Sequence, residues 1–252
     1  MWGIGAVISP YIMSFALIRL SDWHKGYLIV SIIQMVLSAI VFCSLPLWKK
    51  NVADAAPRQA LPLKQVFKIK GAIPCFITFF CYCALENTTM VWASSYLVLH
   101  NGLSTEKAAG LASMFFIGIT LGRAISGLLT MKWNDRTLIR LGETILLLGI
   151  VLIALPCHYF FSLIGFIAIG LGCAPVYPCI IHMTPELFGR DKSQAMIGMQ
   201  MASAYTGSCF IPPLFGVLAN EISASILPIF LSVFLFCMIF LHEVVVKKTK
   251  MI

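Results

Sequence analysis

Charged side chains are scarce in this sequence: Asp, Glu, Lys and Arg make up only 11% of its 252 residues, and just 10 residues are acidic. Soluble domains carry about 25% charged residues, so this shortage excludes an ordinary soluble protein. Hydrophobic residues account for 60% of the chain, and the mean hydropathy is +0.92. We therefore expect an integral membrane protein.

Patterns that would indicate catalysis or metal binding are also missing. There is no HExxH motif, no pair of mid-span carboxylates, and no pair of histidines spaced to complete a metal site. Eight of the nine cysteines lie inside apolar blocks, where cysteine behaves as a small apolar side chain. We therefore predict no enzyme activity, no catalytic residue, no cofactor and no metal. The net charge of +8 is explained by topology below and does not predict a nucleic-acid partner.

The apolar blocks lack the strict alternation of membrane β-strands, and they are too long for strands of about 9 to 11 residues. A block of about 20 residues crosses the bilayer as a helix that satisfies its own backbone. The sequence predicts an all-α fold with eight transmembrane helices, at Trp2 to Leu20, Tyr27 to Leu47, Ala72 to Leu99, Ala108 to Met131, Leu138 to Leu155, Tyr159 to Met183, Ala195 to Ala219, and Ser223 to Leu241.

Basic residues sort to one side of these spans. Three lie on the other side (Arg19, Lys25 and Lys107), Arg123 lies inside a span, and fourteen share the first side: Lys49, Lys50, Arg58, Lys64, Lys68, Lys70, Lys132, Arg136, Arg140, Arg190, Lys192, Lys247, Lys248 and Lys250. The richer side is expected to be cytoplasmic. We predict a multi-pass protein of the cell membrane with both termini in the cytoplasm.

The only long connection divides the predicted helices into two and six. We expect two spans in residues 1–48, a basic cytoplasmic linker at 49–70, and a six-helix transmembrane domain at 71–252. The chain opens almost directly in apolar sequence, which favours an internal or C-terminal piece whose N-terminal half is missing.

Glycine and proline occur at matching places in the third and sixth spans. Gly71 and Pro74 lie in one; Gly170, Gly172, Pro175 and Pro178 lie in the other. Two interpretations stay open: broken helices of an inverted repeat that line a central site, or the ordinary abundance of these residues in membrane helices. Small residues in the fourth span (Gly118, Gly122, Ser126) and the seventh (Ser203, Gly207, Ser208) predict close helix packing.

Glu86 is the only acidic residue near the middle of a span. A charged carboxylate there is costly, by about 2.5 to 3.5 kcal/mol, so it is expected to face the bundle interior. It either takes part in proton coupling or bonds a neighbouring helix. Tyr82 and Thr89 share its helix face, and Asn87 lies on an adjoining one. Three residues of later spans are candidates for an opposite wall that would suit a polyol, with helix packing as the alternative: Tyr177, Gln200 and Tyr205.

Arg123 is the only basic residue well inside a span. It can extend toward the surface or pair with Glu143 near the same end of the fifth span. We expect a structural charge pair between Arg123 and Glu143.

The order of these residues resembles the major facilitator superfamily. The similar segments are Gly3 to Pro10, Gly122 to Arg136, Gly170 to Pro178, Thr184 to Gly189, and Gln200 to Gly216. Met131 stands where the family's loop motif has an acid. The resemblance implies family helices five to twelve, with two helices followed by a six-helix bundle of the major facilitator type, and the last three segments look like the fucose permease branch.

This resemblance implies a secondary transporter. The expected partners are a small organic substrate such as a sugar, the lipid bilayer, a proton as coupling ion through Glu86, and the missing N-terminal half. The alternative is a truncated or regulatory membrane protein without transport activity.

Overall fold

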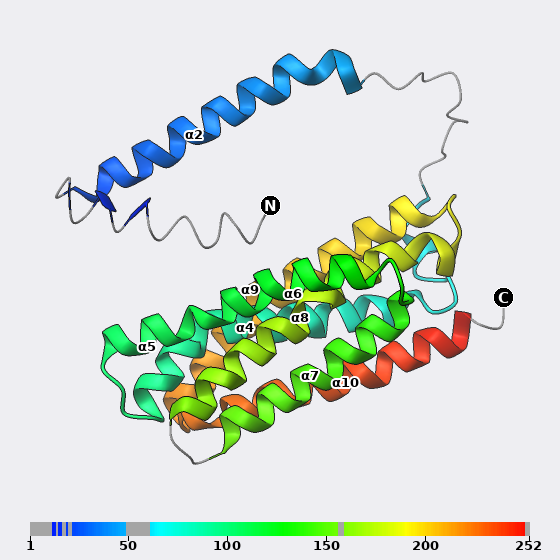
Figure 1. Cartoon of the computed structure of the whole chain (residues 1–252). Coiled ribbons are helices and arrows are strands. Elements are labelled where there is room, and N and C mark those ends of the chain that lie inside the picture. The colour runs from blue at the N-terminus through cyan, green and yellow to red at the C-terminus, as the bar shows by residue number, and fades with distance from the viewer. Residues whose placement is uncertain are drawn as a thin grey trace. The chain divides into compact units, whose positions relative to one another are not determined.

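The computed structural model describes residues 12–13, 15–16, 19, 22–48, 61–155 and 159–249 (Figure 1). Every regular element among these residues is an α-helix or a short 3-10 helix. The predicted all-α fold is therefore confirmed. The chain divides into two units, Met1–Gln59 and Ala60–Ile252, and each is described by itself.

The first unit contains α2 (Trp23–Ser44), which a 3-10 turn (Leu45–Trp48) extends. Asp22 begins the helix, because its side-chain carboxylate accepts a hydrogen bond from the backbone N–H of His24 at 2.9 Å. The second predicted span is confirmed to within four residues. The first predicted span, Trp2 to Leu20, lies largely outside the described residues.

The second unit is a series of long helices with short connections, which lie side by side in Figure 1. Its elements are α3 (Leu63–Val66), α4 (Ala72–Leu99), α5 (Thr105–Ala112), α6 (Met114–Leu129), α7 (Asp135–Ala154), α8 (Tyr159–Phe188), α9 (Ser193–Glu221), a 3-10 turn (Ala224–Ile226) and α10 (Leu227–Thr249). The predicted span from Ala72 to Leu99 matches α4 at both ends. The domain limits 1–48, 49–70 and 71–252 stay a prediction.

Six helices of the described part are long and apolar enough to cross a membrane: α2, Gly110–Leu129, α7, α8, α9 and Ala224–Thr249. The protein is therefore a multi-pass membrane protein. α4 is not among these six, although its 28 residues would span about 42 Å at 1.5 Å per residue. This helix carries the polar run from Glu86 to Thr89, which lowers its hydropathy.

The interpretation of broken third and sixth spans is wrong. α4 and α8 each run without interruption, although α8 contains Pro175, Pro178 and Pro185. Gly71 precedes α4 in the left-handed conformation (φ +88°), and Pro74 lies in the first turn, where a missing N–H costs little. Proline inside a membrane helix is tolerated where neighbouring groups satisfy the freed carbonyl. The break that does occur lies at Ser113, between α5 and α6.

Small residues allow two pairs of helices to approach closely, as the sequence predicts. A Cβ added at Gly118 of α6 would collide with the backbone carbonyl of Ile167 in α8. In the other pair, a Cβ at Gly207 of α9 would lie 2.6 Å from the carbonyl oxygen of Phe80 in α4. α7 packs mainly on α8, and α10 packs mainly on α4. The unit is thus organised as two groups: α6, α7 and α8, and α4, α9 and α10.

Candidate functional site

Glu86 lies midway along α4 and faces Arg123 of α6. Its Oε1 atom is 3.9 Å from Nη2 of Arg123, and the side chains are 13% and 32% exposed, respectively. The distance is at the outer limit of an ion pair. The carboxylate therefore lies inside the helical unit, as predicted, next to a cation and with part of its surface still accessible.

Two tyrosines lie near this pair. Tyr82, one turn before Glu86, is fully buried, and its hydroxyl donates a hydrogen bond to the backbone carbonyl of Cys173 in α8 at 3.1 Å. The ring of Tyr177 lies 5.0 Å from that of Phe79 and 6.4 Å from that of Tyr82, between ring centroids. Both tyrosines are within electrostatic range of Glu86 and Arg123.

Tyr177 is half-buried, and its hydroxyl lies 3.0 Å from the sulfur of Met201 in α9. Tyr177 of α8 therefore contacts α9 through its hydroxyl. Tyr205 of α9 is within electrostatic range of Tyr177 and is 67% exposed. Tyr177 therefore lies between Tyr205 and the group formed by Glu86, Arg123 and Tyr82.

Asn87 and Thr89 make hydrogen bonds that join or stabilise helices. The Asn87 side-chain amide donates to the carbonyl of Cys83 at 3.0 Å and to the hydroxyl of Ser208 in α9 at 2.9 Å. Thr89 is fully buried, and its hydroxyl donates to the carbonyl of Leu85. These contacts account for the amide nitrogen of Asn87 and the hydroxyl of Thr89.

Gln200 is not brought to Glu86. It is fully buried, its amide nitrogen lies 3.0 Å from Cys75 Sγ, and its amide also exchanges hydrogen bonds with the Thr184 hydroxyl. Cys75 precedes Glu86 by eleven residues, which is about 16 Å along a helix. The structure therefore places Gln200 at a helix contact and assembles Glu86, Tyr82, Tyr177 and Arg123 elsewhere.

Arg123 and Glu143, expected to pair with each other, each lie against another partner. Arg123 faces Glu86, whereas Glu143 Oε1 lies 3.1 Å from Nδ1 of His242 in α10. Sequence reasoning missed His242 and the Glu86–Arg123 contact. The depth of the two residues in the membrane could have indicated the Glu86–Arg123 contact. Glu86 lies thirteen residues before the end of α4, and Arg123 lies thirteen residues after Gly110, where the next span begins.

Metal ligands do not gather in the described part of the chain: it contains no group of three His, Cys, Asp or Glu side chains that could hold an ion. The chemistry of the site is therefore that of one carboxylate, one guanidinium and phenol hydroxyls. Such a set can bind a proton or hydrogen-bond a polar solute.

Two comparisons of sequence cover most of the chain. Residues 1–156 and 75–250 match the sequence model described as the Major Facilitator Superfamily. The chain is 31% identical over 111 residues to an alpha-ketoglutarate permease of Bacillus subtilis, a match that spans 42% of this chain and 24% of the permease. It is 23% identical over 160 residues to bypass of stop codon protein 6 of Saccharomyces cerevisiae, covering 60% of this chain and 32% of that protein.

Solved structures share the fold. The Escherichia coli fucose:proton symporter superposes with a TM-score of 0.68 at 16% identity, over 87% of this chain and 57% of the symporter. A peptide transporter gives a TM-score of 0.61 at 15% identity, over 75% of this chain and 43% of its own. The chain thus spans less than two thirds of the length of each of these proteins.

Proposed function

Since the chain belongs to the Major Facilitator Superfamily, we propose that it forms part of a secondary transporter that moves a small organic solute, such as a sugar, together with a proton. The proposed coupling residue is Glu86. The observation that carries this assignment is a largely buried carboxylate in the middle of α4, beside the Arg123 guanidinium and partly accessible.

The proton would bind at Glu86. When Glu86 is ionised, Arg123 offsets its charge; when Glu86 is protonated, this attraction is lost, and the net charge that a solute meets at the pair becomes more positive. Proton binding and solute binding can then influence each other at one place. A separation of 3.9 Å suits such an exchange, because little hydrogen-bond energy is lost when the two groups part.

Tyr82, Tyr177 and Tyr205 support a polyol as the solute. Sugar hydroxyls need directed hydrogen bonds, and the apolar faces of a sugar pack on aromatic rings. The similarity to the fold of a fucose:proton symporter agrees with this choice. A dicarboxylate is the second candidate, because Arg123 could bind a carboxylate and because a relative is an alpha-ketoglutarate permease.

The test is Glu86→Gln in the full-length protein, reconstituted in proteoliposomes. Gln keeps the size and most hydrogen bonds of a protonated Glu but cannot release a proton. We expect pH-driven uptake to be abolished while solute counterflow remains measurable. Undiminished pH-driven uptake would remove Glu86 from the mechanism.

Glu243→Gln is the matched control, because it removes a carboxylate that lies at the surface of α10, paired with Arg140. It should leave both uptake and counterflow unchanged. A panel of sugars and dicarboxylates in the same assay decides between the two solute classes. Absence of both activities from the unmodified protein would favour the regulatory alternative.

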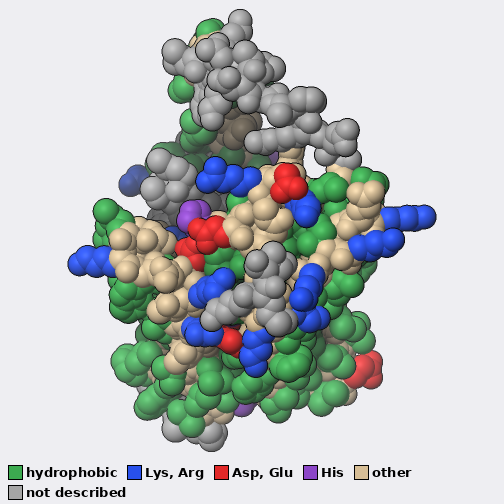
Figure 2. Space-filling model, turned by 90° about the vertical axis from the view of Figure 1, so that its right-hand side faces the viewer, with side chains coloured by type: hydrophobic (Ala, Val, Ile, Leu, Met, Phe, Trp, Pro, Cys, Tyr) green, Lys and Arg blue, Asp and Glu red, His purple; other side chains and the backbone are tan. Residues whose placement is uncertain are grey.

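We also propose a place in the cell membrane with the basic end of the bundle in the cytoplasm. Lys and Arg side chains gather over the end that Figure 2 shows. The element bounds put Lys132 between α6 and α7, Arg190 and Lys192 between α8 and α9, and Lys247 in the last turn of α10. Cysteines introduced at Asn101 and Asn220 should react with an impermeant reagent added outside, and one at Lys192 should not. The reverse pattern would overturn this topology.

A further inference from the structure

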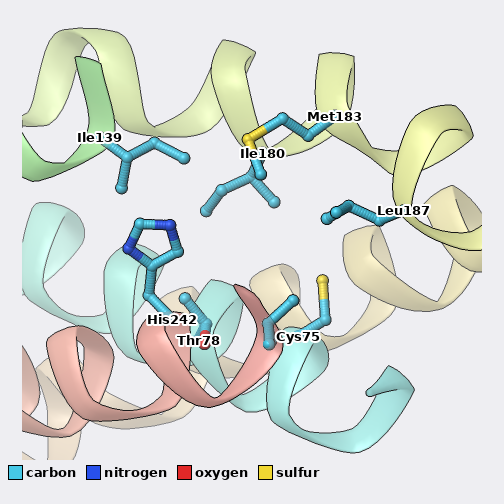
Figure 3. Close-up of a pocket in the computed structure, with 8 residues that line it drawn as sticks. Cys75, Thr78, Ile139, Ile180, Met183, Leu187 and His242 are labelled. Atoms are coloured by element: carbon cyan, nitrogen blue, oxygen red, sulfur yellow. The ribbon is translucent and has the colours of Figure 1, made fainter. Parts of the chain in front are cut away.

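Two segments that carry lysines meet at one end of the helical unit. α10 packs on α4, and His242 of α10 lines the same small pocket as Cys75 and Thr78 of α4 (Figure 3). This pocket lies near the first residue of α4, Ala72, and near the last residue of α10, Thr249. The start of α4 therefore lies beside the end of α10.

A contact at Gly71 shows how close these two helix ends are. A Cβ added at Gly71, which precedes α4, would lie 3.5 Å from Cγ2 of Thr249 and 4.0 Å from Cβ of Lys248. Lys70 adjoins Gly71 in the chain, Lys247 adjoins Lys248, and all three lysines are exposed. Three ammonium groups from distant parts of the sequence therefore project from one small area of the surface.

The positive charge of this area is not neutralised by ion pairs within the described part of the chain. None of the three lysines forms a salt bridge there. Glu243 is within electrostatic range of Lys247, but it accepts hydrogen bonds of 2.8 and 3.0 Å from Arg140. The area thus keeps a net positive charge, which attracts an anion.

The segment before α4 combines apolar and basic side chains. Leu63 and Phe67 are 63% and 48% exposed, and Lys64 and Lys68, the next residue after each, are exposed as well. The ring of Phe67 packs edge-on against that of Phe76 in α4, with 6.0 Å between the centroids. Exposed apolar side chains next to lysines suit the boundary between lipid headgroups and acyl chains.

Apolar surface continues along α4 from the lysines. Ile73 and Ile77 are one helical turn apart, and both are exposed. A ligand with a negatively charged group and hydrocarbon chains would match the lysines and this surface together. A soluble anion would match the lysines alone.

We propose that the start of α4 and the end of α10 form a binding site for an anionic phospholipid. Its phosphodiester group lies among Lys70, Lys247 and Lys248. Its acyl chains follow Ile73 and Ile77. Lysine binds phosphate as a point charge, and clusters of basic residues next to a membrane helix attract anionic headgroups. The site does not depend on the proposed transport activity.

The experiment is photo-crosslinking of the whole chain in phosphatidylcholine nanodiscs that contain a little phosphatidylglycerol with a photoreactive acyl chain. Mass spectrometry locates the labelled peptides. We expect labelling at the first turns of α4 and the last turns of α10, and we expect it to weaken at high salt. Labelling spread evenly over the lipid-facing helices would overturn the site.

Competition identifies the ligand class. Unlabelled phosphatidylglycerol should reduce the labelling, whereas inorganic phosphate at the same concentration should not, because it lacks acyl chains. Equal competition by inorganic phosphate would show a phosphate site and would overturn the lipid assignment.

The variant that tests the lysines combines Lys70→Ser, Lys247→Ser and Lys248→Ser. Each basic residue near the membrane surface strengthens the attraction to anionic lipid several-fold, so labelling at this place should fall by at least about tenfold. All three side chains are exposed, so the variant should fold, which thermal unfolding in phosphatidylcholine checks.

The matched control combines Lys132→Ser, Arg190→Ser and Lys192→Ser, which removes three positive charges from the connections between α6 and α7 and between α8 and α9. It should leave the labelling of α4 and α10 nearly unchanged. Equal losses in the two triple variants would show a general attraction to basic surface and would overturn the site.

Discussion

Two carboxylates of the same helical unit differ in their distance from a basic partner and in the exposure of the pair. Glu86 lies 3.9 Å from Arg123 with both side chains partly exposed, whereas Glu143 lies 3.1 Å from His242 with both side chains buried. A long, accessible pair can separate at little cost, while a short, enclosed one cannot lose a partner without exposing the other to an apolar interior. The burial of a pair, more than the types of its residues, therefore decides whether one of its members can part from the other and bind a solute.

The largest expected effect comes from Glu143→Leu. It leaves His242 buried without its partner, and we expect the free energy of unfolding to fall by about 3 to 5 kcal/mol. Reversible unfolding in mixed detergent and SDS micelles measures this loss.

The matched control is the double variant Glu143→Leu with His242→Leu, in which both polar groups are gone. It should recover most of the stability, because two apolar side chains can pack where the pair was. If the double variant lost the sum of the two single effects, the residues would not be acting as a pair.

A smaller effect is expected of Arg123→Gln. Because the Arg123 side chain is 32% exposed and its contact with Glu86 is long, we expect a loss of only about 1 kcal/mol in the same unfolding assay. Arg123→Lys, which keeps the charge, serves as the control and should lose less. A loss as large as that of Glu143→Leu would contradict the distinction between the two pairs.

The smallest effect is expected of Glu243→Gln, which removes the negative charge and one of the two oxygens that accept hydrogen bonds of 2.8 and 3.0 Å from Arg140, on the surface of α7 and α10. Exposed ion pairs contribute about 0 to 1 kcal/mol and are screened by salt. The difference in the free energy of unfolding between Glu243→Gln and the unmodified protein should therefore be smaller at high salt than at low salt. A salt-independent loss above that range would show that short distance alone, without burial, makes a pair strong.

Much of the fold could be predicted because block length and hydropathy determine where membrane helices lie. The bounds of α4 match the prediction, and α8 begins at the predicted Tyr159. The prolines of α8 left a broken and a continuous helix both open in the sequence, and α8 is continuous, since packing and alternative hydrogen bonds can keep a helix intact through proline. The break at Ser113 carries no such signal, because neither proline nor glycine adjoins it.

The candidate site was only partly predictable. Glu86 is conspicuous as the one acid in the middle of a span, and the structure places Tyr82 and Tyr177 near it. Gln200 lies at a helix contact, which is the alternative that the sequence left open for it, because sequence gives the depth of a residue in the membrane more reliably than the direction in which its helix face points. The partners of Arg123 and Glu143 depend on that direction, and it is determined by packing between helices.

The close approaches at Gly118 and Gly207 have a mechanical consequence. Backbone contact holds α6 against α8, and it likewise holds α4 against α9, so each pair should move as a rigid piece. Arg123 and Tyr177 belong to one piece, and Glu86 belongs to the other. If the two helix pairs move relative to each other, the distance between Glu86 and Arg123 changes directly. Measuring this distance would therefore report the displacement of one helix pair relative to the other.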